Sequence, residues 1–324
     1  MITYPELLDE IEKQLTEINL SGQPNNLYEP MRYLLGIGGK RIRPYALLLS
    51  NKCFGGQVKQ AMPAALAIEV FHNFTLMHDD IMDKAPLRRG HTTVHEKWST
   101  TVAILSGDAM MVKAYQLLEG LPDAHFKSVY AQFNQTAIEV CEGQQFDMDF
   151  ELRNDVLLTE YVEMIRCKTA VLLATSLKLG ALLANASERD QELIYQFGEN
   201  LGIAFQIQDD YLDCYGNAHQ FGKQLAGDIL DRKKTFLLLH MMQYASDEIK
   251  QRVVEAWKSD RISDQELIEL TLSAYASAQT PESTLNTVEH YTMNALLALD
   301  QVSISLEEKQ PLFDLANGLM VRQS

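Results

Sequence analysis

The 324-residue sequence lacks the signals of disulfide-bonded, zinc-binding and membrane-spanning proteins. Its four cysteines are widely spaced and form no C-x-x-C pair, which argues against disulfides and structural zinc and favours a cytoplasmic location. The most apolar window, residues 169–186, contains Lys178 and many small residues, so no stable membrane insertion is expected. The first residues have neither the basic nor the apolar region of a signal peptide.

Basic charge and strand signals are also scarce. The chain has 28 Lys and Arg against 44 Asp and Glu, a net charge of −16, so nucleic acid and anionic membrane surfaces are poor partners. Alternating β-branched runs are rare, Asp-Gly is absent, and the single Asn-Gly pair, Asn317-Gly318, has no strand-like flanks. These absences indicate an all-α chain.

Helical periodicity fills most of the sequence instead. It predicts helices over residues 4–18, 27–35, 44–51, 62–83, 102–118, 125–151, 158–183, 190–213 and 234–244, with further helices to about residue 316. No linker or low-complexity tract divides the chain. We therefore predict one all-α domain over residues 1–324.

One acidic pattern, D-D-x-x-D, occurs twice in predicted helices, its copies beginning 130 residues apart (209 − 79 = 130): Asp79, Asp80, Asp83 and Asp209, Asp210, Asp213. On a helix, positions i, i+1 and i+4 lie within about 100° of one another, so each copy crowds three carboxylates together. A single copy is commonly a solvated acidic face. Two copies with mostly apolar flanks favour carboxylates at the mouth of a cavity, where Mg²⁺ and a diphosphate suit them.

Cations cluster at three places in this acidic chain: Lys40-Arg41-Ile42-Arg43, Arg88-Arg89, and Lys223 with Arg232-Lys233-Lys234. The first follows Gly36–Gly39, a turn whose backbone can approach a ligand closely. Each cluster taken alone is equally consistent with helix-end compensation or ordinary surface charge. Beside two acidic clusters, they favour two anionic ligands, one bridged by metal and one held by cations alone.

These residues resemble the trans-isoprenyl diphosphate synthases (polyprenyl synthetases). The resemblance rests on motifs that follow in order: Gly38-Gly39-Lys40-Arg41-x-Arg43-Pro44, His72, the first D-D-x-x-D, Leu87-Arg88-Arg89-Gly90, Gly143-Gln144-x-x-Asp147, Lys168-Thr169-Ala170, Phe205-Gln206 with the second D-D-x-x-D, Gly222-Lys223, Gly227-Asp228 and Lys233-Lys234. One departure is Thr92, where the family usually has Pro. This affects a loop and no expected ligand.

The resemblance implies a large helical bundle around a deep central cavity, usually as a homodimer. It implies head-to-tail condensation of isopentenyl diphosphate with an allylic diphosphate (dimethylallyl, geranyl or farnesyl). The expected product is a short all-trans prenyl diphosphate, C15 to C20, with C20 slightly favoured.

The family also implies roles for particular residues. About three Mg²⁺ would be held by Asp79, Asp80, Asp83 and Asp209, with Asp210 and Asp213 assisting. The allylic diphosphate would be bound by Arg88, Lys168, Lys223 and Lys233, with Thr169 and Gln206 near the developing carbocation. Isopentenyl diphosphate would be bound without metal by Lys40, Arg43, His72 and Arg89. Of these, the aspartates at 79, 80, 83 and 209 with Lys168 and Lys223 form the expected catalytic set.

Product length is expected to depend on the residues four and five positions before the first acidic cluster, Thr75 and Phe74. In the family, bulky side chains there close the pocket into which the product grows. Phe74 lies about 7.5 Å along the helix from Asp79, so its ring could stop a short chain. The alternative is that Phe74 only packs against a neighbouring helix.

Other functions fit the sequence less well. A class I terpene cyclase shares the first D-D-x-x-D, but its second motif is typically N-D-x-x-S-x-x-x-E. An HD-type metal phosphohydrolase is suggested by His78-Asp79, but the preceding histidine, His72, lies on the same predicted helix. A non-catalytic subunit of a synthase would have degraded acidic motifs, and both are intact.

Overall fold

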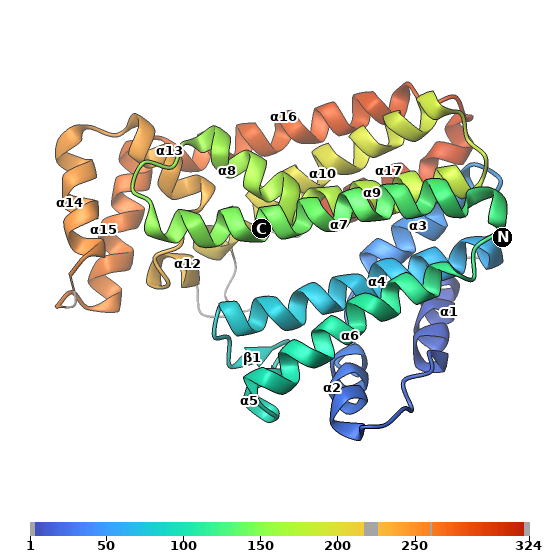
Figure 1. The fold of residues 1–324 in the computed structure, drawn as a ribbon. Helices are drawn as coiled ribbons and strands as arrows, with labels where there is room; N and C mark the ends of the chain where they lie inside the picture. The colour runs from blue at the N-terminus through green and yellow to red at the C-terminus, as the bar shows by residue number, and fades with distance from the viewer. Residues whose placement is uncertain (1–3, 217–225, 260, 321–324) are drawn as a thin grey trace. The chain divides into compact units, whose positions relative to one another are not determined.

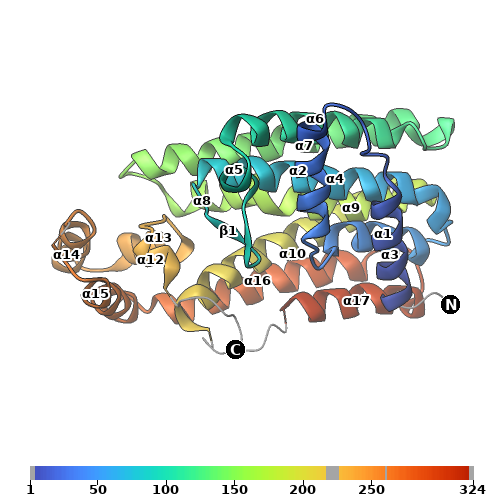
Figure 2. The same cartoon turned by 90° about the horizontal axis from the view of Figure 1, so that it is seen from below.

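The computed structural model describes residues 4–216, 226–259 and 261–320, and these residues are almost entirely helical (Figures 1 and 2). The regular elements other than helices are two strands of two residues each, which pair antiparallel. The predicted all-α class is confirmed. The chain divides into two compact units, residues 1–133 with 175–192 and residues 134–174 with 193–324.

The first unit is built on two long helices that pack along each other, α4 (Val58–Met82) and α6 (Thr100–Leu118). Around them lie α1 (Tyr4–Glu17), α2 (Asn25–Gly36), α3 (Ile42–Cys53), the strands β1 (Leu87–Arg88) and β2 (His91–Thr92), α5 (Val94–Lys97), and parts of α7 (Asp123–Leu152) and α9 (Val171–Leu183). Small residues fill the α4 contacts, since Ala61, Ala64, Ala65 and Ala67 are fully buried. This helix carries the first acidic cluster at its carboxyl end.

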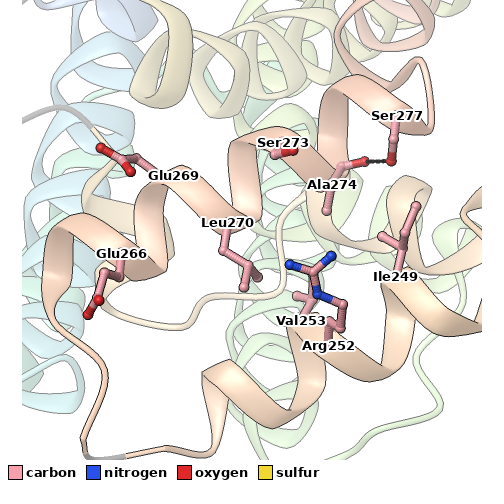
Figure 3. A pocket seen from close by; sticks show the side chains of 9 residues that line it. All are labelled: Ile249, Arg252, Val253, Glu266, Glu269, Leu270, Ser273, Ala274 and Ser277. Atoms are coloured by element: carbon pink, nitrogen blue, oxygen red, sulfur yellow. Dashed lines mark hydrogen bonds between the residues drawn. The ribbon is translucent and has the colours of Figure 1, made fainter.

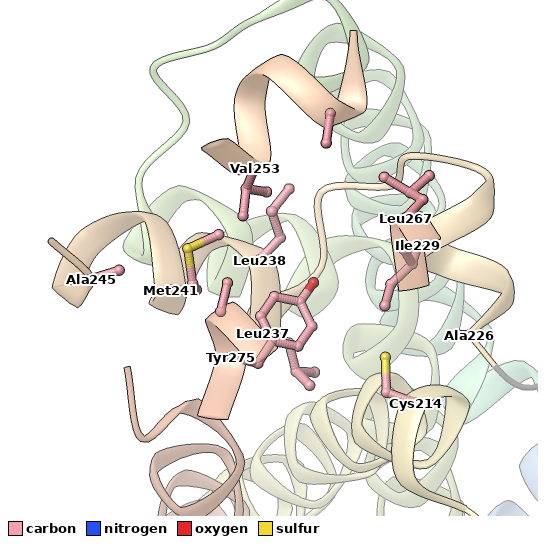
Figure 4. Close-up of a cluster of buried hydrophobic side chains, with 12 residues drawn as sticks. Cys214, Ala226, Ile229, Leu237, Leu238, Met241, Ala245, Val253, Leu267 and Tyr275 are labelled. Carbon is pink, nitrogen blue, oxygen red and sulfur yellow. The ribbon is translucent and has the colours of Figure 1, made fainter. Parts of the chain in front are cut away.

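The second unit contains the rest of α7 and most of α10 (Glu188–Tyr215). The other elements are α8 (Leu158–Ile165), the π-helix η1 (Arg166–Ala170), the start of α9, α12 (Gly227–Leu230), α13 (Phe236–Tyr244), α14 (Asp247–Trp257), α15 (Asp264–Ser277), α16 (Thr280–Asp300) and α17 (Leu306–Met320). One apolar cluster joins α7, α8, α10, α13 and α16. A second, around Tyr275 and Leu237, holds α12–α15 together (Figure 4).

The predicted helices agree with the structure to within a few residues. Residues 158–183 are helical throughout, as predicted, and the sequence did not indicate that the five residues Arg166–Ala170 between α8 and α9 form a π-helix. The β1–β2 ribbon was not predicted, since two residues per strand are too few to show alternation. Lys223 lies outside the described residues. The single domain over residues 1–324 stays a prediction.

None of the described helices combines the length and the apolar character that crossing a membrane requires.

Candidate active site

The first acidic cluster lies where α4 ends, and its middle carboxylate is held in place. Asp80 is 1% exposed, and its Oδ1 accepts bonds of 2.7 Å from Nε and Nη2 of Arg88. The same guanidinium lies 3.7 Å from Asp79. Burial raises the pKa of Asp80, although Arg88 opposes the shift. Asp83 is exposed at the helix end, and Asp79 is partly exposed.

The β1–β2 ribbon carries both arginines of the second cation cluster. Its turn has positive φ at Arg89 (52°) and Gly90 (77°), and Thr93 Oγ1 donates to Ala85 O over 2.7 Å. Arg89 Nη1 donates to Gly38 O. A Cβ on Gly39 would lie 2.7 Å from that guanidinium, so a larger residue there would require the end of the Arg89 side chain to shift. The ribbon is thereby fixed beside the loop that presents Lys40.

A metal-free cationic site surrounds Arg43 and His72. Arg43 Nη1 lies 3.2 Å from His72 Nε2, and the buried Nε of Arg43 has no hydrogen-bond partner among the described residues. Burial, together with the charges of Arg43 and Arg89, keeps the pKa of His72 well below its usual value. A neutral His72 accepts from Arg43 and adds no charge. Burial lowers the pKa of Arg43 too, as expected where positive charge is incompletely compensated.

The second acidic cluster repeats this arrangement in the other unit. Asp210 is 5% exposed and accepts hydrogen bonds from Tyr161 Oη, Phe236 N (3.0 Å) and Gln206 Nε2 (3.3 Å). Burial nevertheless raises the pKa of Asp210 to about 6. Asp213 accepts from Asp228 N over 3.0 Å. Asp209 is exposed, so in both clusters the middle aspartate is a buried acceptor.

The π-helix places Lys168 and Thr169 next to this cluster. Lys168 Nζ lies 2.6 Å from Asp147 Oδ2 on α7, and Thr169 Oγ1 donates to Gln206 Oε1 over 3.1 Å. The approach of α7 requires Gly143, because a Cβ there would lie 2.3 Å from Lys168 N. Since Gln206 also bonds Asp210, a hydrogen-bonded chain links Thr169 to the acidic cluster.

Of the three cations at 232–234, the outer two bind the carboxyl ends of helices, and Lys233 lies between them. Arg232, with φ of 56°, donates from Nε to Trp257 O at the end of α14 (2.7 Å). Lys234 donates to Phe150 O and Glu151 O in the last turn of α7. Both outer cations therefore compensate helix carboxyl ends, the alternative that the sequence left open. They fix the segment that carries Lys233.

The acidic residues suit Mg²⁺, although no group of three Asp, Glu, His or Cys side chains in the described part of the chain forms a complete metal site. Mg²⁺ typically takes one or two carboxylates and completes its shell with water and phosphate oxygens. Asp80 Oδ2 is buried without a hydrogen-bond partner. Burial and the charges of Asp213 and Asp210 raise the pKa of Asp228 to about 7. A divalent cation bound at each cluster would relieve these conditions.

The product-length positions lie in the interior of the first unit. Phe74 is buried, with its ring centroid 5.4 Å from that of Phe71 and 4.9 Å from that of His78. Thr75 Oγ1 donates to the backbone of His72. His78 Nε2 lies 3.2 Å from Ile104 O. His78 is therefore occupied by packing and a backbone contact, which argues against the HD-type metal site.

Two residues around these sites were not predicted from the sequence. Tyr161 binds Asp210 from 49 residues away, and Glu69 pairs with Arg41 from 28 residues away. Neither belongs to a recognisable motif, and only tertiary packing brings each to its partner.

Two pockets lie away from these clusters. One of about 400 Å³ lies between α14 and α15, lined by Arg252, Glu266, Glu269 and mostly apolar neighbours (Figure 3). Another of about 920 Å³ lies among α1, α4 and α6, with Leu7, Met62 and Leu66 in its lining. Neither contains a residue of the two acidic clusters.

Comparison with known proteins agrees with the chemistry of the acidic and basic clusters. Residues 24–274 match the family model described as polyprenyl synthetase. A geranylgeranyl diphosphate synthase of Sulfolobus acidocaldarius is 39% identical, over 94% of this chain and 93% of its own. A crystal structure of a geranylgeranyl pyrophosphate synthase has a TM-score of 0.93 at 42% identity, covering all of both chains. A geranylgeranyl pyrophosphate synthase from Corynebacterium glutamicum, solved with isoprenyl diphosphate and magnesium, has a TM-score of 0.87 at 27% identity over 99% of both chains.

These relatives are synthases, and neither the cyclase nor the phosphohydrolase alternative finds support among them. The family match covers well over half of the chain, and the first relative aligns over nearly all of it. The chain belongs to the polyprenyl synthetase family and is a short-chain trans-prenyltransferase.

Proposed function

We propose that this enzyme condenses isopentenyl diphosphate with an allylic diphosphate and that its two anion sites are divided between the substrates. The observation that carries this proposal is the arrangement on α4. His72, in contact with Arg43, precedes Asp79 by seven residues, a rise of about 10 Å along the helix. A cationic, metal-free site and a metal-type carboxylate site thus lie on one rigid element, two turns apart.

The carboxylates serve the allylic diphosphate. We assign about three Mg²⁺ to Asp79, Asp80, Asp83 and Asp209, with Asp210 and Asp213 assisting through their hydrogen bonds. Bound Mg²⁺ would supply electrostatic stabilisation of the diphosphate as it leaves. Arg88, Lys168, Lys233 and Lys223 add positive charge to the same ligand, the last lying outside the described residues.

Isopentenyl diphosphate is assigned to Lys40, Arg43, His72 and Arg89. The incompletely compensated charge of Arg43 supports this assignment, since a diphosphate would provide acceptors for its Nε. Neutral His72 holds the guanidinium of Arg43 in place and adds no charge to the site.

The reaction follows from these placements. The allylic C–O bond ionises, the double bond of isopentenyl diphosphate attacks the allylic cation, and the new cation loses a proton to the released diphosphate. No side-chain nucleophile or dedicated base is required. Thr169 and Gln206, held together at 3.1 Å, direct oxygen dipoles toward the cation.

We propose C20 as the main product. Geranylgeranyl diphosphate synthases are among the similar proteins, and Phe74 is held against Phe71 and His78, so its ring forms a stable floor. Phe74→Ala should lengthen the product by at least one five-carbon unit. Thr75→Ser, which keeps the hydroxyl that bonds His72 O, is the matched control. Chromatography of the dephosphorylated products measures the length. A wild-type product of C30 or more, or an unchanged length in Phe74→Ala, contradicts the assignment.

We further propose that two copies of the chain associate through α6. Ile104, Leu105 and Val112 are exposed on this helix, a concentration of apolar surface that favours a partner. The cytoplasmic location expected from the scattered cysteines stays a prediction.

A further inference from the structure

Arg41 lies between Lys40 and Arg43 in the sequence but contacts a different set of groups. It is 4% exposed and has φ of 46° at the start of α3. Its Nη1 lies 2.6 Å from Glu69 Oε1, its Nε lies 2.8 Å from Glu12 Oε1, and its Nη2 donates to Leu35 O over 2.7 Å. Arg41 is therefore bound inside the unit and does not serve as a ligand for substrate.

Its main partner, Glu69, lies close to the proposed isopentenyl diphosphate site. Glu69 is 3% exposed and sits on α4 three residues before His72, so the two side chains share one helix face. Arg43 lies 3.2 Å from His72. The charge of Glu69 raises the pKa of both Arg43 and Arg89, opposing the effect of burial.

A buried carboxylate without a cation destabilises the fold. Removing one partner of a buried ion pair typically lowers the free energy of unfolding by several kcal/mol. Glu69 must therefore bind one of the arginines around it. In the structure that arginine is Arg41, through a short, charge-assisted bond. Without Arg41, the arginines that Glu69 still influences are Arg43 and Arg89, and a guanidinium of Arg43 that binds Glu69 is no longer available to a ligand.

We propose that Arg41 is a positioning residue that neutralises Glu69 and thereby leaves Arg43 available to bind isopentenyl diphosphate. The inference rests on the proposed function, because it presupposes that Arg43 binds this substrate. It adds a role for a charge pair that touches no substrate itself.

The test compares the dissociation constant of isopentenyl diphosphate in three variants, measured calorimetrically without allylic substrate. Arg41→Met should weaken binding by at least about tenfold, the loss of one charge-assisted hydrogen bond. In the double variant Arg41→Met/Glu69→Gln, the dissociation constant should return to within about threefold of the wild-type value. The charge of Glu69 that competes for Arg43 is then gone, while the new amide oxygen can still accept from Asn73. Arg41→Lys should retain most of the affinity because a cation still faces Glu69.

Glu12→Gln is the matched control. Glu12 is half-exposed and binds the same guanidinium, so its loss disturbs Arg41 but leaves Glu69 paired. Its affinity for isopentenyl diphosphate should stay within about twofold of wild type. KM for the allylic substrate should change by less than about twofold in every variant, since the acidic cluster is untouched.

A double variant that binds no better than Arg41→Met would overturn the proposal, as would equal weakening of both substrates. If Arg41→Met does not fold, the double variant and Arg41→Lys decide alone, and a double variant weakened tenfold contradicts the inference. Wild-type protein that does not bind isopentenyl diphosphate, or an Arg43→Ala variant that binds it normally, would refute the proposed function instead.

Discussion

The middle aspartate of each D-D-x-x-D behaves differently from its neighbours. Asp80 is bound by Arg88, and Asp210 is bound by Tyr161, Gln206 and a backbone N–H. Positions i and i+4 of a helix share a face, whereas i+1 is turned by about 100°. The periodic pattern therefore predicts the cluster but not this division, which depends on partners 4 to 49 residues away.

The difference between the outer and the middle aspartate predicts different effects for two variants of the second cluster. Asp209→Asn should lower kcat by roughly 10²-fold or more with little change in thermal stability, because it removes an exposed carboxylate assigned to the Mg²⁺ that would stabilise the leaving group. Asp210→Asn should lower the melting temperature as well, since it alters a buried acceptor of three hydrogen bonds. Steady-state kinetics and thermal denaturation measure both. Equal melting temperatures in the two variants would contradict the division.

The crowded carboxylates also predict a pH dependence. The pKa of Asp228 is raised to about 7 and that of Asp210 to about 6, so without metal their contribution to stability is full below about pH 4 and is lost as the pH rises through 6 to 7. Mg²⁺ requires the ionised carboxylates. The increase in melting temperature on adding Mg²⁺ should therefore be larger at pH 8 than at pH 6, and Asp228→Asn should reduce this difference. An increase that is larger at pH 6 would contradict the assignment.

At the level of single side chains, the sequence identified residues in motifs but not the bonds between them. Thr169 and Gln206 were expected near the carbocation, and the structure adds that they bond to each other at 3.1 Å. Arg41 was grouped with the phosphate-binding cations because a run of basic residues does not reveal which one a carboxylate binds. Its partner Glu69 lies in an otherwise apolar stretch of α4.

Among the elements, the π-helix Arg166–Ala170 is the feature that periodicity could not reveal. Five residues are too few to shift an apolar period, and the turn depends on α7 approaching at Gly143. The long helices α4, α7 and α10 were predicted because each shows several turns of consistent pattern. Elements were thus predictable where the local sequence determines the conformation. They were not predictable where contact with the backbone of another helix determines it.

The π-helix predicts the effect of a small substitution. Gly143→Ala would place a Cβ 2.3 Å from Lys168 N, so the turn carrying Lys168 and Thr169 must move. The free energy of unfolding should fall by about 1–3 kcal/mol, and kcat should fall with it. Gly318→Ala on α17 is the control, because nothing lies within 4 Å of its Cβ, and there stability should rise by about 0.5–1 kcal/mol. Full activity in Gly143→Ala would show that the turn does not position these residues.

For the molecule as a whole, the fold class was predictable because helical period recurs from end to end while strand signals are nearly absent. Association between copies is harder to predict from sequence than the fold class, since a periodic pattern does not distinguish an exposed apolar residue from a core residue. On α6, Met110 is fully buried while Leu105 and Val112 are more than half exposed. Only the folded structure separates these two groups.

The exposed face of α6 predicts a dimer that charge can disrupt. Leu105→Glu/Val112→Glu should convert a two-chain species into single chains, because burying two carboxylates in an apolar interface is unfavourable. Leu306→Glu, at an exposed position at the start of α17, should leave the assembly intact. Light scattering coupled to size-exclusion chromatography gives the mass. A wild-type protein that is a single chain at micromolar concentration would contradict the proposed dimer.

The most direct test of the account is product analysis with purified protein, isopentenyl diphosphate and an allylic diphosphate, with and without Mg²⁺. The account predicts a linear C20 prenyl diphosphate and equimolar release of diphosphate per condensation, in the presence of Mg²⁺ and not after its removal. Condensation that continues without a divalent metal, or release of only a cyclic hydrocarbon or inorganic phosphate, would contradict it.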